Sequence, residues 1–373
     1  MCCLDYTKAM KEGVIVMHYR DTYALIRLDY LKDNVETLYQ KVKKPMIAII
    51  KANAYGHGYQ QVANVLKDYP SISMFGVATL KEAIDLRKLG VRQDILVLGA
   101  IPLEDLDMVI EYDITLTLFS KEYMHEILFL HHHSKPVKVH IKIDTGMNRI
   151  GFKTKEEFVD ILAHCPAHVF QIDGVFTHFA TADDEQQNDA YETQLKLFYD
   201  MIGSYSFRYI HCQNSASMMY HDEPRSNMAR IGIAMYGVDP AGEETEKLKQ
   251  VMSLYTKVVM IKSIKKGERI GYGLTYTAEE DEQIATLPIG YADGFIRANQ
   301  GREVYINGRY YPIVGRVCMD QVMIRVDEHV KIHDQVEIFG EHISLSRMAK
   351  ELQTIPYEIM CLVSERVERI YQK

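Results

Sequence analysis

Short runs rich in β-branched residues alternate with segments of helical periodicity through the first two thirds of the chain. This alternation is typical of βαβ units around a parallel sheet. The predicted strands are Met46–Ile50, Met74–Ala78, Ile95–Leu98, Ile114–Phe119, Lys138–Ile143, Ile172–Thr177, Tyr209–His211 and Arg230–Met235. The intervening helices include Leu80–Leu89, Lys121–Leu130 and Glu156–His164. These eight strands predict a (β/α)8 barrel, in which catalytic side chains collect at the C-terminal ends of the strands.

The pattern changes near Val251, after which strands with alternating polar and apolar residues predominate. Asn307-Gly308 has the sequence of a tight hairpin, and one capped helix is expected after Ser344. A chain of 373 residues also exceeds the roughly 250–300 that one hydrophobic core usually supports. We therefore predict a barrel domain with a short N-terminal extension over residues 1–250, followed by a mostly β domain over residues 251–373.

Composition and charge narrow the class of protein. Hydrophobic residues make up 47% of the chain and charged residues 25%, which is the balance of an ordinary globular enzyme. The formal net charge is −8 and the basic residues are scattered, so neither nucleic acid nor a membrane surface is an expected partner. No apolar run approaches the ~18 residues of a spanning helix, and the N-terminus lacks a signal-peptide pattern. We expect a cytoplasmic protein.

Cysteine and histidine usage gives little indication of a metal site. The six cysteines are dispersed and form no CxxC pair, so we expect free thiols. Cys2 and Cys3 are compatible with lipidation, although a disordered terminus is the simpler interpretation. The run His131–His133 has no carboxylate at ligand spacing in the sequence, which favours a solvated loop over a metal site.

Lys51 ends an apolar strand and precedes the segment Ala52–Gly58, which places its amine at the mouth of the predicted barrel. A lone lysine is usually a solvated surface charge. At a strand end among apolar residues, however, its pKa can fall enough for a Schiff base to form with an aldehyde. Gly56 and Gly58 permit a tight turn, and the hydroxyl of Tyr55 can reach an anion there.

A phosphate pocket is expected after the seventh and eighth strands of such a barrel, where backbone N–H groups converge. Asn214-Ser215 follows the seventh predicted strand, and Arg230–Ile233 occupies the eighth. Ser215, Gly232 and Ile233 can therefore offer a hydroxyl and a close backbone approach to an anion. Either segment alone is equally compatible with an ordinary loop.

The segment Ile50–Gly58 closely resembles the cofactor-lysine motif of alanine racemases. Further segments resemble that family in the same order: Asp144–Arg149, Thr177–Phe179, Arg230–Gly237, Gly271–Gly273, Pro288–Gly294 and Gly315–Gln321. The resemblance covers about residues 20–370. It implies a fold-type III pyridoxal 5'-phosphate enzyme that interconverts L- and D-alanine, works as a homodimer with active sites between subunits, and supplies D-alanine for cell-wall peptides.

The resemblance assigns catalytic and cofactor-binding roles by motif. Lys51 carries the cofactor as a Schiff base and moves a proton on one face of Cα, and the partner subunit's Tyr272 serves the other face. The cofactor-binding positions are Lys51, Tyr55, His178, Ser215, Arg230, Gly232 and Ile233. Arg230 meets the pyridine nitrogen; because arginine stays protonated, the ring is a weaker electron sink, which suits a racemase. His178 supports Tyr272, with His211 behind Arg230.

Substrate recognition is also assigned by the resemblance. Arg149 and the backbone N–H of Met319 bind the substrate carboxylate, with Tyr291 nearby, and the guanidinium fork of arginine suits a carboxylate. Lys142 lies on the strand that leads to Arg149, and the matching lysine of the family is often carbamylated. A carbamate would turn a cation beside Arg149 into an anion that orients it.

One segment departs from the family pattern. The chain reads Glu365-Arg-Val-Glu-Arg369 where some members have Tyr-Arg-Val-Pro-Arg. An ionised glutamate cannot donate a hydrogen bond to phosphate, so Glu365 must turn away or pair with an arginine such as Arg297 or Arg316. Without the tyrosine ring, a pocket that accepts serine or a broader range of small amino acids becomes the nearest alternative.

Two more distant alternatives differ in class. A decarboxylase of the same fold type is less favoured, because those enzymes typically set a glutamate where this chain has Arg230. A non-catalytic pyridoxal phosphate carrier uses a similar barrel, but the predicted β domain with Tyr272 and Met319 argues against it.

Overall fold

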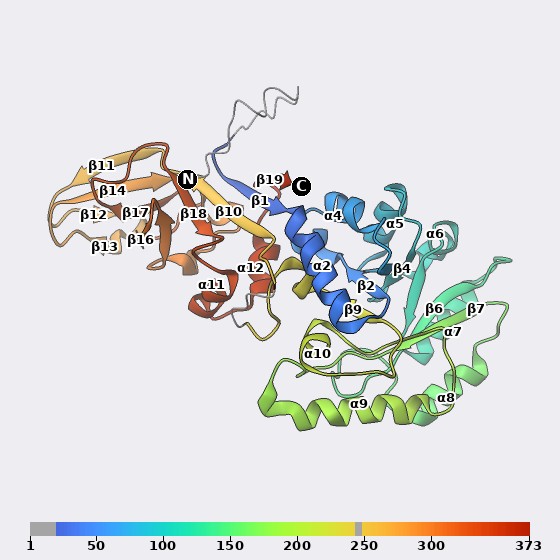
Figure 1. Cartoon of the computed structure of the whole chain (residues 1–373). Coiled ribbons are helices and arrows are strands. Elements are labelled where there is room, and N and C mark those ends of the chain that lie inside the picture. Colours follow the sequence, from blue (N-terminus) through green and yellow to red (C-terminus); the bar gives the residue numbers. More distant parts are fainter. Residues whose placement is uncertain (1–19, 243–247) are drawn as a thin grey trace. The chain divides into compact units, whose positions relative to one another are not determined.

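The computed structural model describes residues 20–242 and 248–373 (Figure 1). The predictions for Cys2 and Cys3 lie outside these residues. Internal contacts divide the chain into two compact units, which are described separately. The barrel unit consists of Leu25–Ser253, Ser344–Ser364 and Arg369–Lys373, and the β unit of the residues up to Ala24, Leu254–Ile343 and Glu365–Glu368. This division differs from the predicted boundary after residue 250, because helices near the C-terminus pack on the barrel.

Eight parallel strands form the sheet of the barrel unit (Figure 1). They are β2 (Met46–Ile49), β3 (Ile72–Val77), β4 (Asp94–Val97), β5 (Thr115–Leu118), β6 (Val137–Lys142), β7 (Phe170–Phe176), β8 (Tyr209–His211) and β9 (Ala229–Ile231). Their order is β8-β7-β6-β5-β4-β3-β2-β9. The Arg230 N–H donates to the Gln213 carbonyl at 3.1 Å and nearly closes the sheet between its two ends. The predicted (β/α)8 barrel is confirmed.

Helices connect these strands. They are α2 (Leu28–Val42), α3 (Lys51–Tyr55), α4 (Tyr59–Leu66), α5 (Leu80–Lys88), α6 (Leu106–Glu111), α7 (Lys121–Leu130), α8 (Lys155–His164), α9 (Asn188–Ile202) and α10 (Ser215–Tyr220), with short 3-10 turns η2 (Leu103–Asp105), η3 (Glu185–Gln187) and η4 (Ile233–Tyr236). The three predicted helices are confirmed to within one residue at either end. Capping boxes begin two of them, with Thr79 and Glu82 at α5 and Thr154 and Glu157 at α8.

Two predicted details of the barrel unit are wrong. The eighth strand was expected to reach Met235, but β9 ends at Ile231 and the chain then forms η4. Gly232 breaks the strand with φ −118° and ψ −110°, and its N–H turns to the side chain of Ser215. Near the C-terminus, one helix was expected after Ser344, but two are present, α11 (Leu345–Leu352) and α12 (Pro356–Leu362). The second is short and begins at a proline, which obscures it in the sequence.

The β unit is built on antiparallel strands in the order β11-β14-β17-β16-β15-β18-β10, and the same sheet continues through the strands Tyr23–Arg27 and Glu368–Gln372. Its strands are β10 (Met252–Lys257), β11 (Met260–Ile264), β14 (Glu282–Leu287), β15 (Glu303–Ile306), β16 (Arg309–Val314), β17 (Val322–Val326) and β18 (Gln335–Phe339), with a separate pair β12 (Arg269–Ile270) and β13 (Tyr276–Thr277) and the 3-10 turns η5 (Tyr272–Leu274), η6 (Tyr291–Asp293) and η7 (Arg297–Asn299). The chain passes between the units within β1 (Tyr23–Arg27), β10 and β19 (Glu368–Gln372), and also after Ile343 and after Ser364.

The predicted hairpin at Asn307-Gly308 is confirmed between β15 and β16. Both residues have positive φ, 47° and 91°, as a two-residue turn between twisted strands requires. None of the described helices is both long and apolar enough to span a membrane.

Candidate functional site

Lys51 lies two residues after the last residue of β2, at the C-terminal end of a barrel strand. The next four residues, Ala52 to Tyr55, all have left-handed backbone conformations with φ between 51° and 54°. Such a conformation costs about 1–2 kcal/mol for each residue with a side chain. Lys51 is half-buried, and burial together with the charge of Arg149 lowers its pKa. A lowered pKa leaves more of the amine unprotonated and nucleophilic.

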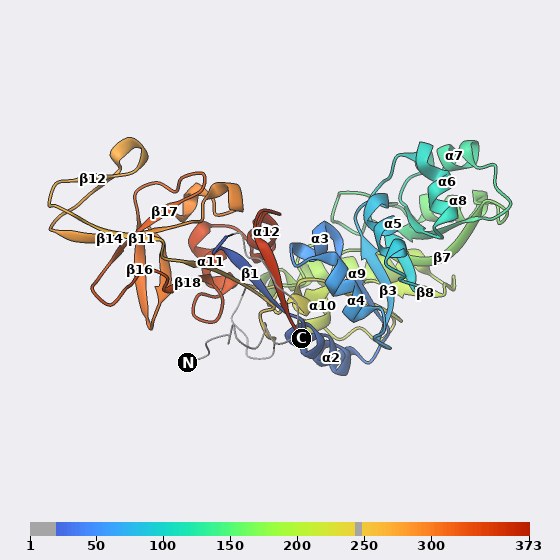
Figure 2. The ribbon, with the colours of Figure 1, turned by 90° about the horizontal axis from the view of Figure 1, so that it is seen from above.

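The left-handed segment is held by groups distant in the sequence. The Ala52 N–H donates to Glu82 Oε1 at 2.6 Å, and Arg369 Nε donates to the Gly56 carbonyl at 3.0 Å. Helix α12 packs against α3 (Figure 2). A β-carbon on Gly56 would lie 2.3 Å from the carbonyl oxygen of Met360, so this contact excludes any side chain.

A small cradle of hydroxyl and backbone groups lies at the ends of β8 and β9. Ser215 Oγ accepts hydrogen bonds from the N–H groups of Gly232 at 2.9 Å and Ala234 at 3.5 Å. A β-carbon on Gly232 would come within 3.0 Å of the Tyr55 hydroxyl and 3.7 Å of Ser215 Oγ. Burial raises the pKa of Tyr55, which keeps its hydroxyl protonated and able to donate. Two hydroxyls that can donate, at a position without a side chain, fit a phosphate group.

Arg230 anchors a buried polar network beside this cradle. Its guanidinium donates to the carbonyl oxygens of His211, of Thr177 at 2.7 Å and of Cys212 at 3.1 Å. Its nitrogens also lie 3.3 Å from His178 Nδ1 and 3.0 Å from His211 Nδ1. Burial lowers the pKa of Arg230 to about 10, so the side chain still carries its charge near neutral pH. The structure thus brings Arg230 and both predicted histidines together.

Both histidines are neutral for the same physical reason. Burial and the charge of Arg230 lower the pKa of His178 and of His211 well below the ordinary value. His211 Nε2 lies 2.9 Å from Nδ1 of His140, a buried residue of β6 that sequence reasoning missed. His140 occupies a buried position of a barrel strand, and the sequence around it does not distinguish it from an ordinary core residue.

Lys142 and Arg149 lie at the end of β6 and in the loop that follows. Lys142 is buried, and its pKa is lowered well below the ordinary value by burial and by the charges of Arg230 and Arg149. Arg149 is exposed in a loop that Asp144 Oδ1 holds by accepting the N–H groups of Gly146 and Asn148, each at 3.0 Å. The lowered pKa favours the neutral form of the Lys142 amine in the field of the cationic Arg149.

The β unit carries the other three predicted residues. The Tyr291 N–H donates to the Cys318 carbonyl, and the Ala292 N–H to the Met319 carbonyl, both at 3.0 Å. These bonds place the loops of Tyr291 and Met319 side by side, and both side chains are exposed. A β-carbon on Gly290 would lie 2.4 Å from the Met319 carbonyl, which shows how closely the loops approach.

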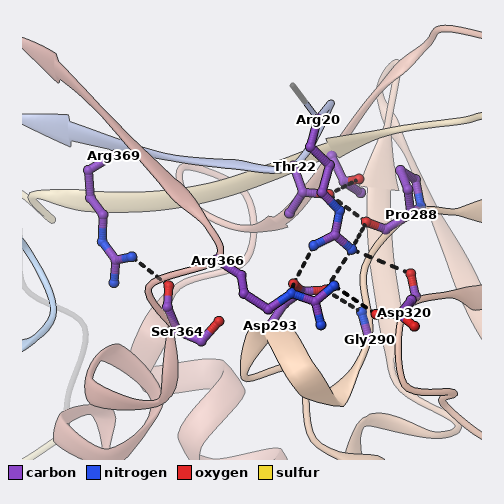
Figure 3. Close-up of polar contacts among 10 residues, drawn as sticks. Arg20, Thr22, Pro288, Gly290, Asp293, Asp320, Ser364, Arg366 and Arg369 are labelled. Atoms are coloured by element: carbon purple, nitrogen blue, oxygen red, sulfur yellow. Dashed lines mark hydrogen bonds and ion pairs between the residues drawn. The ribbon is translucent and has the colours of Figure 1, made fainter. Parts of the chain in front are cut away.

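A buried carboxylate holds this pair of loops (Figure 3). Asp293 accepts the Gly290 N–H at 2.9 Å and both terminal nitrogens of Arg20, whose Nη2 lies 2.8 Å from Oδ2. Arg366 lies 3.7 Å from Asp293 and donates to Asp320 at 2.7 Å. Two arginines from opposite ends of the chain thus converge on one carboxylate in the turn that begins at Tyr291, and neither arginine was predicted.

Tyr272 lies in the exposed turn η5, and 72% of its surface is accessible. The flanking glycines have φ of 71° and 73°. A β-carbon on Gly273 would lie 2.8 Å from Arg316 Nη1, so this guanidinium lies against the turn. Glu365 is exposed within the short C-terminal segment of the β unit.

The structure corrects the interpretation of His131–His133. No carboxylate stands at ligand spacing from this run in the sequence, but Asp107 of α6 approaches it in space. Asp107 Oδ1 lies 2.8 Å from His133 Nε2 and 3.7 Å from His132 Nε2, and both Asp107 and His132 are exposed. Sequence spacing therefore does not reveal this cluster of Asp107, His132 and His133, whereas the loop is solvated as predicted.

Comparison with known proteins identifies the family. A model of the alanine racemase N-terminal domain matches residues 26–240, and a model of the alanine racemase C-terminal domain matches residues 251–371. The chain belongs to the alanine racemase family. The alanine racemase of Anoxybacillus flavithermus is 42% identical over 370 residues, a match that covers 95% of this chain and 96% of that protein. The alanine racemase of Halalkalibacterium halodurans is 41% identical over 372 residues, with 95% of each chain covered.

Solved structures of alanine racemases agree in fold. That from E. faecalis has a TM-score of 0.91 at 38% identity and covers 96% of this chain and all of that one. That from Bacillus anthracis with bound L-Ala-P has a TM-score of 0.88 at 37% identity and covers 96% of each chain. As a member of the alanine racemase family, the chain is an isomerase that acts on a small amino acid. The decarboxylase and non-catalytic carrier alternatives are therefore rejected.

Proposed function

We propose that the protein binds pyridoxal 5'-phosphate on Lys51 and interconverts L- and D-alanine by proton transfer on both faces of the substrate Cα. The observation that supports this most directly is the convergence of the Tyr55 and Ser215 hydroxyls on Gly232, in a unit that also carries the lowered-pKa amine of Lys51. Once the substrate amine has displaced Lys51 Nζ from the cofactor, the cofactor would withdraw electron density from the substrate and make the Cα proton removable, with the Lys51 amine free to act on it.

The barrel unit supplies the groups that hold the cofactor. Tyr55 and Ser215 donate their hydroxyls to the phosphate, and Gly232 and Ile233 provide the backbone approach. Arg230 faces the ring nitrogen as a hydrogen-bond donor that keeps its proton. Such a partner would make the ring a weaker electron sink, which would favour return of a proton to Cα over side reactions.

Two acid/base groups complete the reaction. Lys51 Nζ takes or gives a proton on one face of Cα, and the hydroxyl of the partner subunit's Tyr272 acts on the other. His178, which is neutral beside Arg230, is the group that supports this tyrosine. The exposure of Tyr272 in a single chain supports a homodimer in which the β unit of one subunit completes the barrel of the other.

The substrate carboxylate is bound by Arg149 and by the backbone N–H of the partner subunit's Met319, with the partner subunit's Tyr291 beside it. Arginine donates two parallel hydrogen bonds to a carboxylate. Lys142 is carbamylated in this proposal. Its buried amine of lowered pKa can react with carbon dioxide, and the resulting anion orients Arg149.

Serine is the second candidate substrate. Glu365 takes the place of a tyrosine that closes the pocket in some relatives, and its side chain is exposed to solvent. A pocket without that ring has room for a hydroxymethyl group.

A turnover assay tests both candidates. Purified protein loaded with pyridoxal phosphate is given L-alanine or L-serine, and the D-amino acid is measured by chiral chromatography. We expect kcat/KM for alanine to exceed that for serine. A higher kcat/KM for serine would show that serine, not alanine, is the preferred substrate. If the enzyme converts neither amino acid, the proposed function is rejected.

A further inference from the structure

Glu82 contacts the segment that carries Lys51 although it belongs to another βα unit. Its Oε1 accepts the Ala52 N–H at 2.6 Å, while its Oε2 accepts the N–H groups of Ala78 at 2.8 Å and Thr79 at 3.2 Å. One carboxylate therefore ties the residue directly after Lys51 to the end of β3 and the start of α5.

The bonded residue is also the first of the strained ones. Ala52 begins the left-handed run that ends at Tyr55, a conformation that residues with side chains rarely adopt. Backbone strain of this kind persists only where surrounding groups determine the conformation. This run joins Lys51 to Tyr55. Its backbone conformation therefore determines where the amine of Lys51 lies relative to the hydroxyl of Tyr55.

We propose that Glu82 is a positioning residue for the cofactor lysine: by accepting the Ala52 N–H, it fixes the left-handed segment so that Lys51 and Tyr55 meet the cofactor together. The inference rests on the proposed role of Lys51. The charge of Glu82 also acts on Lys51, where it opposes the lowering of the pKa by burial and by Arg149.

The chain contains a matched control. Glu157 forms the same capping box at α8, where its Oε2 accepts the N–H groups of Lys153 at 2.8 Å and Thr154 at 3.2 Å. The hydroxyls of Thr79 and Thr154 cap Glu82 N and Glu157 N in the same way, at 3.3 Å and 3.2 Å. The two glutamates thus share every capping bond, and Glu82 adds the bond to Ala52.

The test compares cofactor binding by wild type, Glu82→Ala and Glu157→Ala. Cofactor-free protein is titrated with pyridoxal phosphate, the visible absorption band is followed, and borohydride reduction with peptide mass analysis measures the share trapped on Lys51. Both variants lose a similar amount of thermal stability. Only Glu82→Ala binds cofactor more weakly, by about tenfold, which corresponds to roughly 1.4 kcal/mol, and a smaller share is trapped on Lys51.

Two further outcomes are decisive. Equal cofactor affinity in Glu82→Ala and Glu157→Ala would overturn the positioning role, whereas a wild-type protein that shows no band would overturn the proposed function itself. If Glu82→Ala fails to fold, Glu82→Gln and Glu157→Gln replace the pair. The amide oxygen of glutamine keeps an acceptor, so Glu82→Gln should weaken cofactor binding less than tenfold but still more than Glu157→Gln does.

Discussion

At the scale of single residues, Lys51 combines three properties that a covalent cofactor site requires. It follows a buried strand, its pKa is lowered, and the next residues turn sharply toward the cradle. We predict that Lys51→Ala loses the visible absorption of the bound cofactor, because no other amine completes the covalent link. The band is measured at saturating pyridoxal phosphate, and its persistence at wild-type intensity would contradict the assignment.

Lys142 gives a second prediction at this scale. Only an unprotonated amine reacts with carbon dioxide, and burial together with the charges of Arg230 and Arg149 lowers the pKa of Lys142. We expect a carbamate resonance in the ¹³C NMR spectrum of protein equilibrated with labelled bicarbonate, and its loss in Lys142→Met.

Lys138 on the same strand provides the control. Its ammonium pairs with Asp113 at 2.8 Å, and its pKa is raised. Lys138→Met should therefore retain the carbamate resonance, and a wild-type spectrum without any such resonance would reject the modification.

Sequence reasoning found the residues that stand in motifs and missed those that act through space. Lys51 and Tyr55 are predicted from sequence because a lysine and two glycines after an apolar strand form a rare pattern. Glu82 and Asp107 were missed because each belongs to an ordinary helix start or surface, and only the fold brings it beside its partner. Such contacts have no signal in a single sequence.

At the scale of elements, the packing of α12 on α3 makes Gly56 indispensable. Gly56 and Gly90 have the same φ of 82°, but a β-carbon on Gly90 would meet nothing within 4 Å. Gly90→Ala should cost about 1 kcal/mol from backbone strain. Gly56→Ala should cost roughly 1–3 kcal/mol more, because the methyl group overlaps the Met360 carbonyl.

Equilibrium unfolding in urea measures both losses, and cofactor titration shows whether the Lys51 segment has moved. We expect weaker cofactor binding only in Gly56→Ala. Equal losses in the free energy of unfolding in the two variants would show that α12 moves away from the new methyl group without any loss of stability.

Element boundaries were predicted well where periodicity decides them and poorly where a single contact does. The strands and the helix after Ser120 follow from hydrophobic pattern and capping. The end of β9 depends instead on the bond from the Gly232 N–H to Ser215 Oγ, which joins two separate βα units. No local pattern reports that bond, so Ile233 was assigned to a strand.

At the scale of the whole molecule, the predicted site residues fall into two sets. Those proposed to hold the cofactor belong to the barrel unit, whereas Tyr272, Tyr291 and Met319 belong to the β unit. There Asp293 and its arginines fix the loops of Tyr291 and Met319. The sequence indicated both domains by their patterns. The pairing of the two sets across a dimer came only from the family resemblance, because one chain does not report which copy supplies each residue.

The central claim is that each active site combines Lys51 of one subunit with Tyr272 of the other. It is tested most directly by mixing Lys51→Ala subunits with Tyr272→Phe subunits that carry a different affinity tag. Each parent is inactive, because every site in it lacks one acid/base. In a mixed dimer with shared sites, one site carries both substitutions and the other is intact, so random exchange should restore about a quarter of wild-type activity. Tandem purification on the two tags confirms that mixed dimers form. Mixed dimers without racemase activity would contradict the account.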